Sequence, residues 1–312
     1  MSIKNVVVVG AGMMGNALAQ VFASNPDLYV VLKTRSLKED RWAPIENNLD
    51  IMIARGAATE QEKADIISRI HFETDDAAAY TDADFIIECF PEVMETKQQL
   101  FCHIEEFCSD KCILATNSSV MSSTEIGSKC KHPERVVGAH FWNPGHLIPL
   151  VEVIKSDVTE EWVIEETMAL MTACGKKPVY CKKDVPGFVA NRLQHALWRE
   201  AFYMVENGIA DAKTVDDACK YGPGLRWPVM GPMENSDVVS IELTKNIHDY
   251  ILPHLADNHE PSKCLAEMLA RGDNGFKTGK GWQEWTPEQI LASNTGLREY
   301  LIDYIAKQKA EE

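Results

Sequence analysis

Two side chains with acid–base chemistry, His140 and Glu152, occur in neighbouring apolar segments of the chain. His140 lies in the strand-like run 136–141, and Glu152 lies within the run 150–154. A carboxylate in so apolar a strand is costly to bury unless it is paired, and an imidazole is the expected partner. The carboxylate would orient the imidazole and stabilise its protonated form, which suits a general base near neutral pH. The alternatives are a core histidine bonded to the backbone and a strand carboxylate whose face lies in water.

A glycine-rich turn near the N-terminus joins a valine-rich, strand-like segment, 3–9, to a helix-like segment, 16–23. The turn has the spacing G-x-G-x-x-G, and its candidate binding residues are Gly10, Gly12, Met13, Met14 and Gly15. In this context the first glycine makes the tight turn, the second lets backbone approach a pyrophosphate, and the third allows close helix–strand packing. The helix N-terminus attracts the phosphates. The pattern predicts dinucleotide binding, the alternative being a strand–helix turn without a ligand.

The end of the second predicted strand, 28–32, bears on the choice between NAD and NADP. A site for NAD usually places an acidic residue there, about 20 residues past the glycines, to bind the ribose 2′-hydroxyl. No carboxylate follows this strand before Glu39. A 2′-phosphate would instead meet Thr34, Arg35 and Ser36, and arginine binds phosphate bidentately. The sequence therefore slightly favours NADP over NAD, although a solvated basic turn in an NAD site would have the same composition.

The predicted elements supply a scaffold for these residues. The first half alternates short buried strands with helices, and from residue 188 onward long helical patterns dominate. The predicted fold is α/β, a Rossmann-type doubly wound sheet over 1–184 followed by an all-helical C-terminal domain over 185–312. The predicted strands are 3–9, 28–32, 84–88, 113–116, 136–141, 150–154 and 178–181. The predicted helices of the first half are 16–23, 45–54, 60–70, 94–107 and 160–174. The strands 136–141 and 150–154 are close enough in sequence to form an antiparallel pair at a sheet edge.

The composition of the 312 residues narrows the class of protein. Lys and Arg number 31 and Asp and Glu number 47, so the formal net charge is −16. This charge excludes binding to the nucleic-acid backbone as the main function. The apolar runs are too short to span a membrane, and no cleavable signal segment is expected at the N-terminus. Because the nine cysteines lack the spacing of a metal site, we expect no metal and reduced thiols in a cytoplasmic protein.

Several motifs stand in an order that is typical of one family. They are the glycine turn, 117–119 (Asn-Ser-Ser), 140–144 (His-Phe-Trp-Asn-Pro), 150–153 (Leu-Val-Glu-Val) and 184–192 (Asp-Val-Pro-Gly-Phe-Val-Ala-Asn-Arg). Over nearly its whole length the chain resembles the 3-hydroxyacyl-CoA dehydrogenase family. The resemblance implies a Rossmann domain followed by an all-helical substrate and dimerisation domain, a homodimer, and NAD(P)-dependent chemistry at a CH–OH group.

The resemblance also implies roles for individual residues. His140 would be the catalytic base and Glu152 its orienting carboxylate, while Ser119 and Asn191 would hydrogen-bond the reacting oxygen of the substrate. Ser119 rather than Ser118 fits the family's spacing to the histidine. The family's cofactor contacts would fall on Glu92, Lys97, Ser119, Asn143 and Lys277. For Lys97 the alternative is a solvated helix lysine.

Two features distinguish the chain from family members that act on acyl-CoA. Those members carry a lysine-rich segment for the CoA phosphates after the second strand, where this chain has few cations. The basic residues there are Arg41, Arg55 and Lys63. The segments 143–150 and 222–232 are closer to relatives that act on free hydroxy acids, such as gulonate and carnitine dehydrogenases. Arg226 could pair with a substrate carboxylate, or could instead be an interface or capping arginine.

These observations lead to one principal hypothesis and three alternatives. The principal hypothesis is an NAD(P)-dependent dehydrogenase that moves a hydride between nicotinamide and the hydroxyl or carbonyl of a small hydroxy-carboxylate. The first alternative is a short-chain L-3-hydroxyacyl-CoA dehydrogenase, such as one for 3-hydroxybutyryl-CoA. The second is a non-catalytic protein, crystallin-like or nucleotide-sensing, against which the complete set of catalytic residues argues. The third is a β-hydroxyacid dehydrogenase with a catalytic lysine, but Asn191 stands where that lysine would be.

Overall fold

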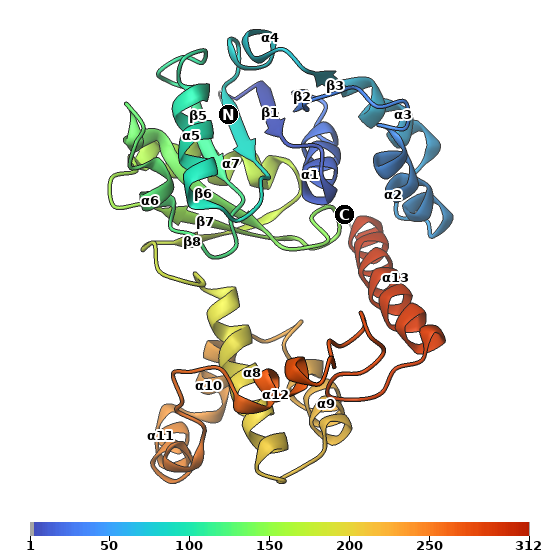
Figure 1. Ribbon diagram of the computed structural model, residues 1–312, viewed down its shortest axis with the longest axis vertical. Coiled ribbons are helices and arrows are strands. Elements are labelled where there is room, and N and C mark those ends of the chain that lie inside the picture. The colour runs from blue at the N-terminus through green and yellow to red at the C-terminus, as the bar shows by residue number, and fades with distance from the viewer. Residues whose placement is uncertain (1–2, 312) are drawn as a thin grey trace. The chain divides into compact units, whose positions relative to one another are not determined.

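The computed structural model describes residues 3–311 and shows two compact units (Figure 1). The first unit contains the chain up to Ala190 together with the segment from Gly296 onward, and the second is Asn191–Thr295. The predicted domains 1–184 and 185–312 are continuous segments of the chain. The two units are instead defined by which residues contact one another, so a unit can contain segments that are distant in sequence. The domain boundaries therefore stay a prediction, but the end of the chain packs with the first unit, which the sequence did not indicate.

An eight-stranded sheet forms the centre of the first unit, in the order β3-β2-β1-β4-β5-β6-β7-β8. The strands are β1 (Asn5–Val9), β2 (Tyr29–Lys33), β3 (Ile70–Glu73), β4 (Phe85–Glu88), β5 (Ile113–Thr116), β6 (Val136–Phe141), β7 (Leu150–Lys155) and β8 (Lys177–Cys181). Neighbouring strands are parallel except β6 and β7. The strand order reverses at β1, where sheets of this kind form their ligand crevice. The predicted Rossmann-type sheet is confirmed.

Two details of the sheet differ from the prediction. The segment 70–73 forms β3 beside β2, where the sequence pattern predicts no strand. Its four residues, Ile-His-Phe-Glu, are too few to separate a strand pattern from the helix before them. The antiparallel pairing of β6 with β7 is confirmed, but the pair does not lie at the sheet edge, because β8 continues the sheet beside β7.

Helices cover both faces of the sheet, and the valines of β1 show why. Val6 and Val8 enter one core and Val7 and Val9 the other, because successive side chains of a strand point to opposite faces. Helices α1 and α7 cover the first core, and α5 and α6 cover the second. The helices of this unit are α1 (Met13–Ala23), α2 (Ala43–Ala54), α3 (Glu60–Arg69), α4 (Asp76–Tyr80), α5 (Met94–Ile104), α6 (Ser123–Gly127), η1 (Pro133–Arg135) and α7 (Glu161–Ala173).

The last helix, α13 (Pro287–Glu311), is tied to the α2–α3 region of the first unit. The Arg55 guanidinium binds both carboxylate oxygens of Asp303, at 3.0 and 2.7 Å. Lys309 Nζ lies 2.8 Å from the carboxylate of Glu62. Ile302 is buried in a small apolar cluster that also contains Met52 and Leu147 of the first unit. The end of the chain therefore belongs to the first unit, although its sequence has the same helical pattern as the C-terminal part that precedes it.

The second unit is built of helices, which confirms the predicted all-helical C-terminal part. Its helices are α8 (Ala190–Glu206, whose first residue belongs to the first unit), α9 (Ala212–Tyr221), η2 (Pro223–Leu225), α10 (Pro232–Val239), α11 (Ile241–Ile251), η3 (Leu252–His254), α12 (Lys263–Ala270) and the start of α13. Among the described residues, helices α8 to α11 have no buried side chain. Since a helix normally buries its apolar stripe, these faces lack a cover within the second unit.

Three further facts concern membranes, metals and cysteines. None of the helices in the described part of the chain is both long and apolar enough to cross a membrane. Within residues 3–311, no group of three or more His, Cys, Asp or Glu side chains is arranged to hold a metal ion. All nine cysteines are free thiols.

Candidate active site

His140 and Glu152 face each other across the antiparallel pair of β6 and β7, where they are partners in the register. The imidazole Nδ1 lies 2.9 Å from Oε2 of Glu152, and Nε2 lies 3.1 Å from Oγ of Ser119. Both strand residues are buried, His140 with 4% and Glu152 with 0% of its surface exposed. Ser119 follows β5, so three neighbouring strands bring the three side chains together. The result is a hydrogen-bonded line from a hydroxyl through an imidazole to a carboxylate.

Glu152 accepts hydrogen bonds at both of its carboxylate oxygens. Oε2 also receives Nε1 of Trp142 at 3.3 Å, and Oε1 receives the N–H groups of Val189 and Ala190 at 2.8 and 2.9 Å. Burial alone would raise the pKa of Glu152, but the hydrogen bonds from His140, the two amides and Trp142 hold this pKa below its usual value. An ionised carboxylate only accepts, so a neutral imidazole donates from Nδ1, and its Nε2 is then the acceptor for the hydroxyl of Ser119.

Glu92 holds the loop that carries Ser119. Its carboxylate accepts from the N–H of Ser119 at 2.8 Å and from the hydroxyl of Ser118 at 2.7 Å. The buried Ser118 hydroxyl also accepts from the N–H of Met121 at 2.9 Å. Of the two adjacent serines, Ser118 thus supports the loop and Ser119 hydrogen-bonds the imidazole, which supports the choice of Ser119 made from the sequence.

Lys97 is buried, with 1% of its side chain exposed, and is not a solvated helix lysine. Its Nζ lies 2.7 and 2.9 Å from the two carboxylate oxygens of Glu88 and 3.2 Å from the carbonyl oxygen of Phe90. It also lies 3.7 Å from the carboxylate of Glu92. The solvated alternative is therefore wrong. A contact of Lys97 with the cofactor stays a prediction, while its position shows that it supports Glu92.

Glu88 is a supporting residue that the sequence analysis missed. It ends β4, is completely buried, and also accepts a hydrogen bond from the hydroxyl of Thr116 at the end of β5. A signal was present in the sequence, because a carboxylate that closes the apolar run 84–88 needs a partner if it is buried. The partner, Lys97, belongs to a helix that the sequence pattern alone does not place beside it.

The glycine turn has the geometry that a dinucleotide site requires. Gly10 has a φ of +106°, in the region that favours glycine. A Cβ on Gly15 would lie 1.7 Å from the carbonyl oxygen of Gly10, so a larger residue does not fit there. A Cβ on Gly12 would meet nothing within 4 Å, so the backbone there is open to a ligand. Nδ2 of Asn16 braces the turn by donating to the carbonyl oxygens of Ala11 and Gly12, at 3.0 and 2.9 Å.

The start of α1 completes this cradle. Its N-cap, Gly12, makes no side-chain cap, and Met13 and Met14 occupy the first turn, with Met13 largely exposed. Backbone N–H groups at an uncapped helix start bind phosphates well. The residues present therefore fit the pyrophosphate of a dinucleotide.

The residues at and after the end of β2 have two kinds of environment: Lys33 is buried and bound by other residues, whereas Arg35 and Ser36 face solvent. Lys33 is buried, and its Nζ lies 2.9 Å from both the Asp76 carboxylate and the carbonyl oxygen of Thr74. Arg35 and Ser36 are exposed. Lys33 thus serves the fold, whereas Arg35 presents its guanidinium to solvent at the place where a ribose 2′-group is expected.

Two family models match the chain. The model described as 3-hydroxyacyl-CoA dehydrogenase, NAD binding domain, matches residues 5–185, and the one described as 3-hydroxyacyl-CoA dehydrogenase, C-terminal domain, matches residues 187–285. The chain belongs to the 3-hydroxyacyl-CoA dehydrogenase family. The resemblance inferred from the motifs is thereby confirmed.

Individual relatives of this family member are dehydrogenases of different kinds. The chain is 33% identical to human "Hydroxyacyl-coenzyme A dehydrogenase, mitochondrial" over 291 residues, 91% of each chain. It is 36% identical to L-carnitine dehydrogenase of Bacillus cereus, over 74% of this chain and 70% of the relative. The crystal structure of 5-formyl-3-hydroxy-2-methylpyridine 4-carboxylic acid 5-dehydrogenase, an NAD+-dependent dismutase, matches with a TM-score of 0.87, 29% identity and 97% coverage of both chains. The chain is accordingly an NAD(P)-dependent oxidoreductase acting on CH–OH groups.

Three of the predicted site residues of this dehydrogenase lie in the second unit. Asn191 is the first residue of that unit and directly follows the two amides that bind Glu152. Arg226 follows η2 and Lys277 lies in a turn before α13, and both are exposed. Asn143 is exposed in the loop between β6 and β7 of the first unit. The roles of these four residues toward cofactor and substrate stay predictions.

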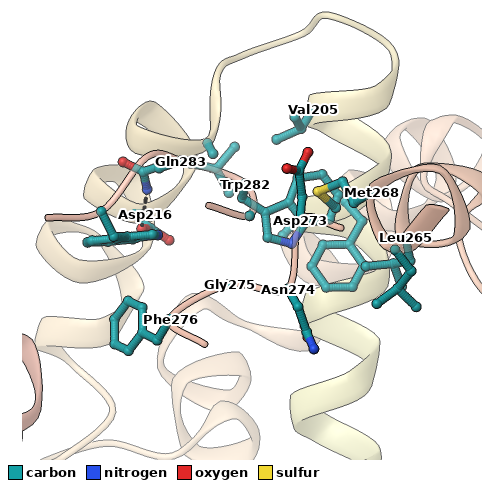
Figure 2. A pocket seen from close by; sticks show the side chains of 17 residues that line it. Val205, Asp216, Leu265, Met268, Asp273, Asn274, Gly275, Phe276, Trp282 and Gln283 are labelled. Atoms are coloured by element: carbon teal, nitrogen blue, oxygen red, sulfur yellow. Dashed lines mark hydrogen bonds between the residues drawn. The ribbon is translucent and has the colours of Figure 1, made fainter. Parts of the chain in front are cut away.

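The helical unit of the dehydrogenase also contains a pocket of about 520 Å³ (Figure 2). Aromatic rings form much of its wall. Phe202 and Trp282 stack with ring centroids 4.7 Å apart, and Phe276 meets Trp285 edge to face at 4.9 Å. Lys277 follows Phe276 but does not line the pocket. All of its lining residues belong to the second unit, and none of them belongs to the line Ser119–His140–Glu152.

Proposed function

We propose that this dehydrogenase interconverts the hydroxyl and carbonyl forms of a small free hydroxy acid, with His140 as the general base. The observation that carries the proposal is the hydrogen-bonded line from Ser119 through His140 to Glu152, with distances of 3.1 and 2.9 Å. In the oxidation, the substrate O–H bond breaks and its proton passes to Nε2 of His140. At the same time a hydride leaves the carbon that bears this hydroxyl, and a carbonyl group forms. The bound nicotinamide supplies the acceptor for that hydride, or its donor in the reverse direction.

The other residues of the proposed site hold groups in place. Glu152 keeps the imidazole in the tautomer that accepts at Nε2 and stabilises its protonated form. Ser119 and Asn191 would hydrogen-bond the reacting oxygen. The cofactor would be held by the glycine turn with Met13 and Met14, by Thr34, Arg35 and Ser36, and by Glu92, Lys97, Ser119, Asn143 and Lys277. Arg226 would pair with the carboxylate of the substrate.

The basic residues near α2 and α3 support a free acid over a CoA thioester. Arg55 is bound by Asp303, and Lys63 is bound by Asp50. The guanidinium of Arg41 lies 5.7 Å from the centre of an aromatic ring and donates to a backbone carbonyl. These cations already have partners, so a CoA phosphate would have to compete for them. The relatives named for carnitine and for a pyridine carboxylate are consistent with this choice.

The substrate class is tested by binding and turnover together. NADH and NADPH are titrated by the quenching of tryptophan fluorescence, with and without acetoacetyl-CoA, and a panel of hydroxy acids is assayed in both directions. We expect a hydroxy acid to be oxidised and acetoacetyl-CoA neither to be reduced nor to change binding. Rapid reduction of acetoacetyl-CoA would instead identify a short-chain 3-hydroxyacyl-CoA dehydrogenase. Tight cofactor binding without any turnover would favour the non-catalytic alternative.

Arg226 provides a second test of the free acid. We expect Arg226→Met to weaken a free hydroxy acid much more than a CoA thioester, because only the free acid offers a carboxylate. An equal loss for both would identify a structural arginine.

NADP is the proposed cofactor because Arg35 is exposed where no carboxylate follows β2. Arg35→Asp should raise the Kd for NADPH and lower that for NADH, since a carboxylate repels a 2′-phosphate and accepts from a 2′-hydroxyl. Arg298→Asp, at an exposed position of α13, is the control for the change of charge. A ratio of the two Kd values that does not change would identify Arg35 as a solvated residue of an NAD site.

The homodimer and a reducing, cytoplasmic environment are also proposals. The dimer is supported by the helices α8 to α11, whose apolar residues are exposed along the second unit, for example Leu193, Val238, Ile247 and Tyr250. Exposed apolar surface on this scale marks an interaction site. The reducing environment is supported by the nine free thiols.

A further inference from the structure

The linker between β8 and α8 begins at an unusually well-bound carboxylate. Oδ2 of Asp184 accepts hydrogen bonds from the hydroxyls of Ser122, Ser123 and Thr124, at 2.7, 3.0 and 2.9 Å, and from the N–H of Thr124, at 2.8 Å. Hydrogen bonds to an ionised acceptor are about twice as strong as bonds between neutral groups. Asp184 thus fastens the start of the linker to the beginning of α6.

The other end of the linker is fastened to the base. The N–H groups of Val189 and Ala190 bind Oε1 of Glu152, whose Oε2 binds His140. The next residue is Asn191, which is proposed to hold the reacting oxygen. The path of the linker between Asp184 and Glu152 therefore fixes where the peptide leading into Asn191 starts.

The carboxylate of Asp184 also holds the loop that carries Ser119. This loop runs from β5 to α6 and has two carboxylates as its supports. Glu92 binds the N–H of Ser119, and Asp184 binds the residues from Ser122 to Thr124. The hydroxyl of Ser122 also accepts from the N–H of Glu125, so the cap of α6 belongs to the same network. Ser119 lies between these two points of attachment.

We propose that Asp184 is a positioning residue for hydride transfer. Its carboxylate ties the loop of Ser119 to the linker whose other end binds Glu152 through the amides of Val189 and Ala190, and so holds Ser119 in register with His140. The inference rests on the proposed function in assigning the reacting oxygen to Ser119. Asp184 itself does not touch the reacting atoms and acts through the two segments that it joins. Misplacement of reacting groups by about 1 Å can cost about 10²-fold in rate.

The variant Asp184→Asn tests the role with little change of shape. An amide keeps one acceptor oxygen for the four donors but loses the charge. Its N–H₂ group would take the place of Oδ1, which is buried without a hydrogen-bond partner among residues 3–311. We expect single-turnover hydride transfer to slow by about tenfold or more, with the stoichiometry and Kd of cofactor binding unchanged. Asp211→Asn is the control, because Asp211 also accepts a helix N–H, that of Thr214 at 2.7 Å, but in the second unit.

Two measurements on the same variant do not depend on turnover. Lys182 and Lys183 are exposed directly before Asp184, so release of the linker should speed tryptic cleavage after Lys182, a bond that does not involve residue 184, relative to the wild type and to Asp211→Asn. The side-chain nitrogen resonances of His140 should shift, because the hydrogen bond that the Ser119 hydroxyl donates to Nε2 depends on the position of the loop. These readouts distinguish a failure of the present inference from a failure of the proposed function.

Each outcome has a defined meaning. Slower hydride transfer with unchanged cofactor binding, faster cleavage and shifted His140 resonances would support the positioning role. Faster cleavage with an unchanged rate of hydride transfer would overturn it and leave Asp184 as a structural anchor. If the wild type oxidises no substrate, the proposed function fails, and unchanged His140 resonances in Asp184→Asn would then overturn the inference separately.

Discussion

At the scale of single residues, replacement of His140 should lower the rate of the reaction without changing the affinity for the cofactor. Its Nδ1 is bound to a carboxylate and its Nε2 lies beside Ser119. We expect His140→Gln to lower kcat by roughly 10²–10⁴-fold, because an amide can hydrogen-bond but cannot take up the proton. The Kd of the cofactor, measured by tryptophan fluorescence, should not change.

The control for this prediction is a second histidine bonded to a carboxylate. His103→Gln breaks a bond to Asp76 of 2.8 Å and should leave kcat unaffected. An unchanged kcat in His140→Gln would remove His140 from the mechanism.

Another histidine, His146, is expected to affect stability. Its Nδ1 is buried with no hydrogen-bond partner among residues 3–311. Burial, together with the charge of Lys176, lowers its pKa from 6.5 to about 4. As the pH falls, the unfolded chain therefore takes up this proton before the folded chain does. The corresponding contribution to stability is fully present above pH 6.5 and is lost as the pH falls towards 4.

The variant His146→Gln removes this titration. Between pH 6.5 and 4, the free energy of unfolding of the wild type should fall more steeply than that of the variant, by up to about 3 kcal/mol. Urea unfolding curves measured across this range give the comparison. Equal pH dependence in the two proteins would show that His146 is accessible to protons in the folded state.

At the scale of elements, the turn between β1 and α1 makes contrasting predictions for its glycines. A Cβ at Gly15 would overlap the carbonyl oxygen of Gly10, whereas a Cβ at Gly12 would meet open space. Gly15→Ala should therefore lower Tm and weaken cofactor binding together, because the turn has to open. Gly12→Ala should leave Tm unchanged and weaken cofactor binding by about tenfold, since the methyl group occupies the path of the pyrophosphate.

Thermal unfolding without cofactor and fluorescence titration with it check both variants. Each glycine serves as the control for the other, because both changes add one methyl group to the same turn. Full affinity for the cofactor in Gly12→Ala would place the pyrophosphate elsewhere.

At the scale of the whole molecule, the second unit raises the question of what covers its helices. Tyr250 of α11 is 79% exposed and Val238 of α10 is 68% exposed. Helices whose apolar stripes face water are not expected to be stable alone, since tertiary packing supplies most of a helix's stability. A second copy of the chain is the occupant that we propose for these faces.

Sedimentation equilibrium should therefore show a particle of two chains. Ile247→Asp, on the exposed apolar face of α11, should raise the dissociation constant of the dimer by about 100-fold or more, because a charge would be buried at the interface. The neighbouring Asn246→Asp adds the same charge at an exposed polar position and should leave the dimer intact. A monomer in the wild type, or a dimer in Ile247→Asp that is as tight as in the wild type, would contradict the proposed interface.

Much of the site could be predicted from the sequence, because its signals are local. The glycine spacing between a strand and a helix describes a turn of a few residues, and its geometry is as expected at Gly10 and Gly15. His140 and Glu152 each stand out as polar residues in apolar strands, and the burial cost of a lone carboxylate predicted their pairing. The antiparallel register of β6 and β7 then follows from the short connection between them.

Other features depend on partners that are distant in the chain. A lysine on an amphipathic helix has the same local sequence pattern whether it is solvated or buried. The burial of Lys97 is therefore decided by the packing of α5 against the end of β4, where its Nζ binds the carboxylate of Glu88. The helical pattern of α13 likewise does not show that Asp303 binds Arg55. Asp184 joins two loops through four donors that carry no periodicity. Local sequence reports which side chains are buried and in which element, whereas their partners are chosen by the topology that brings the elements together.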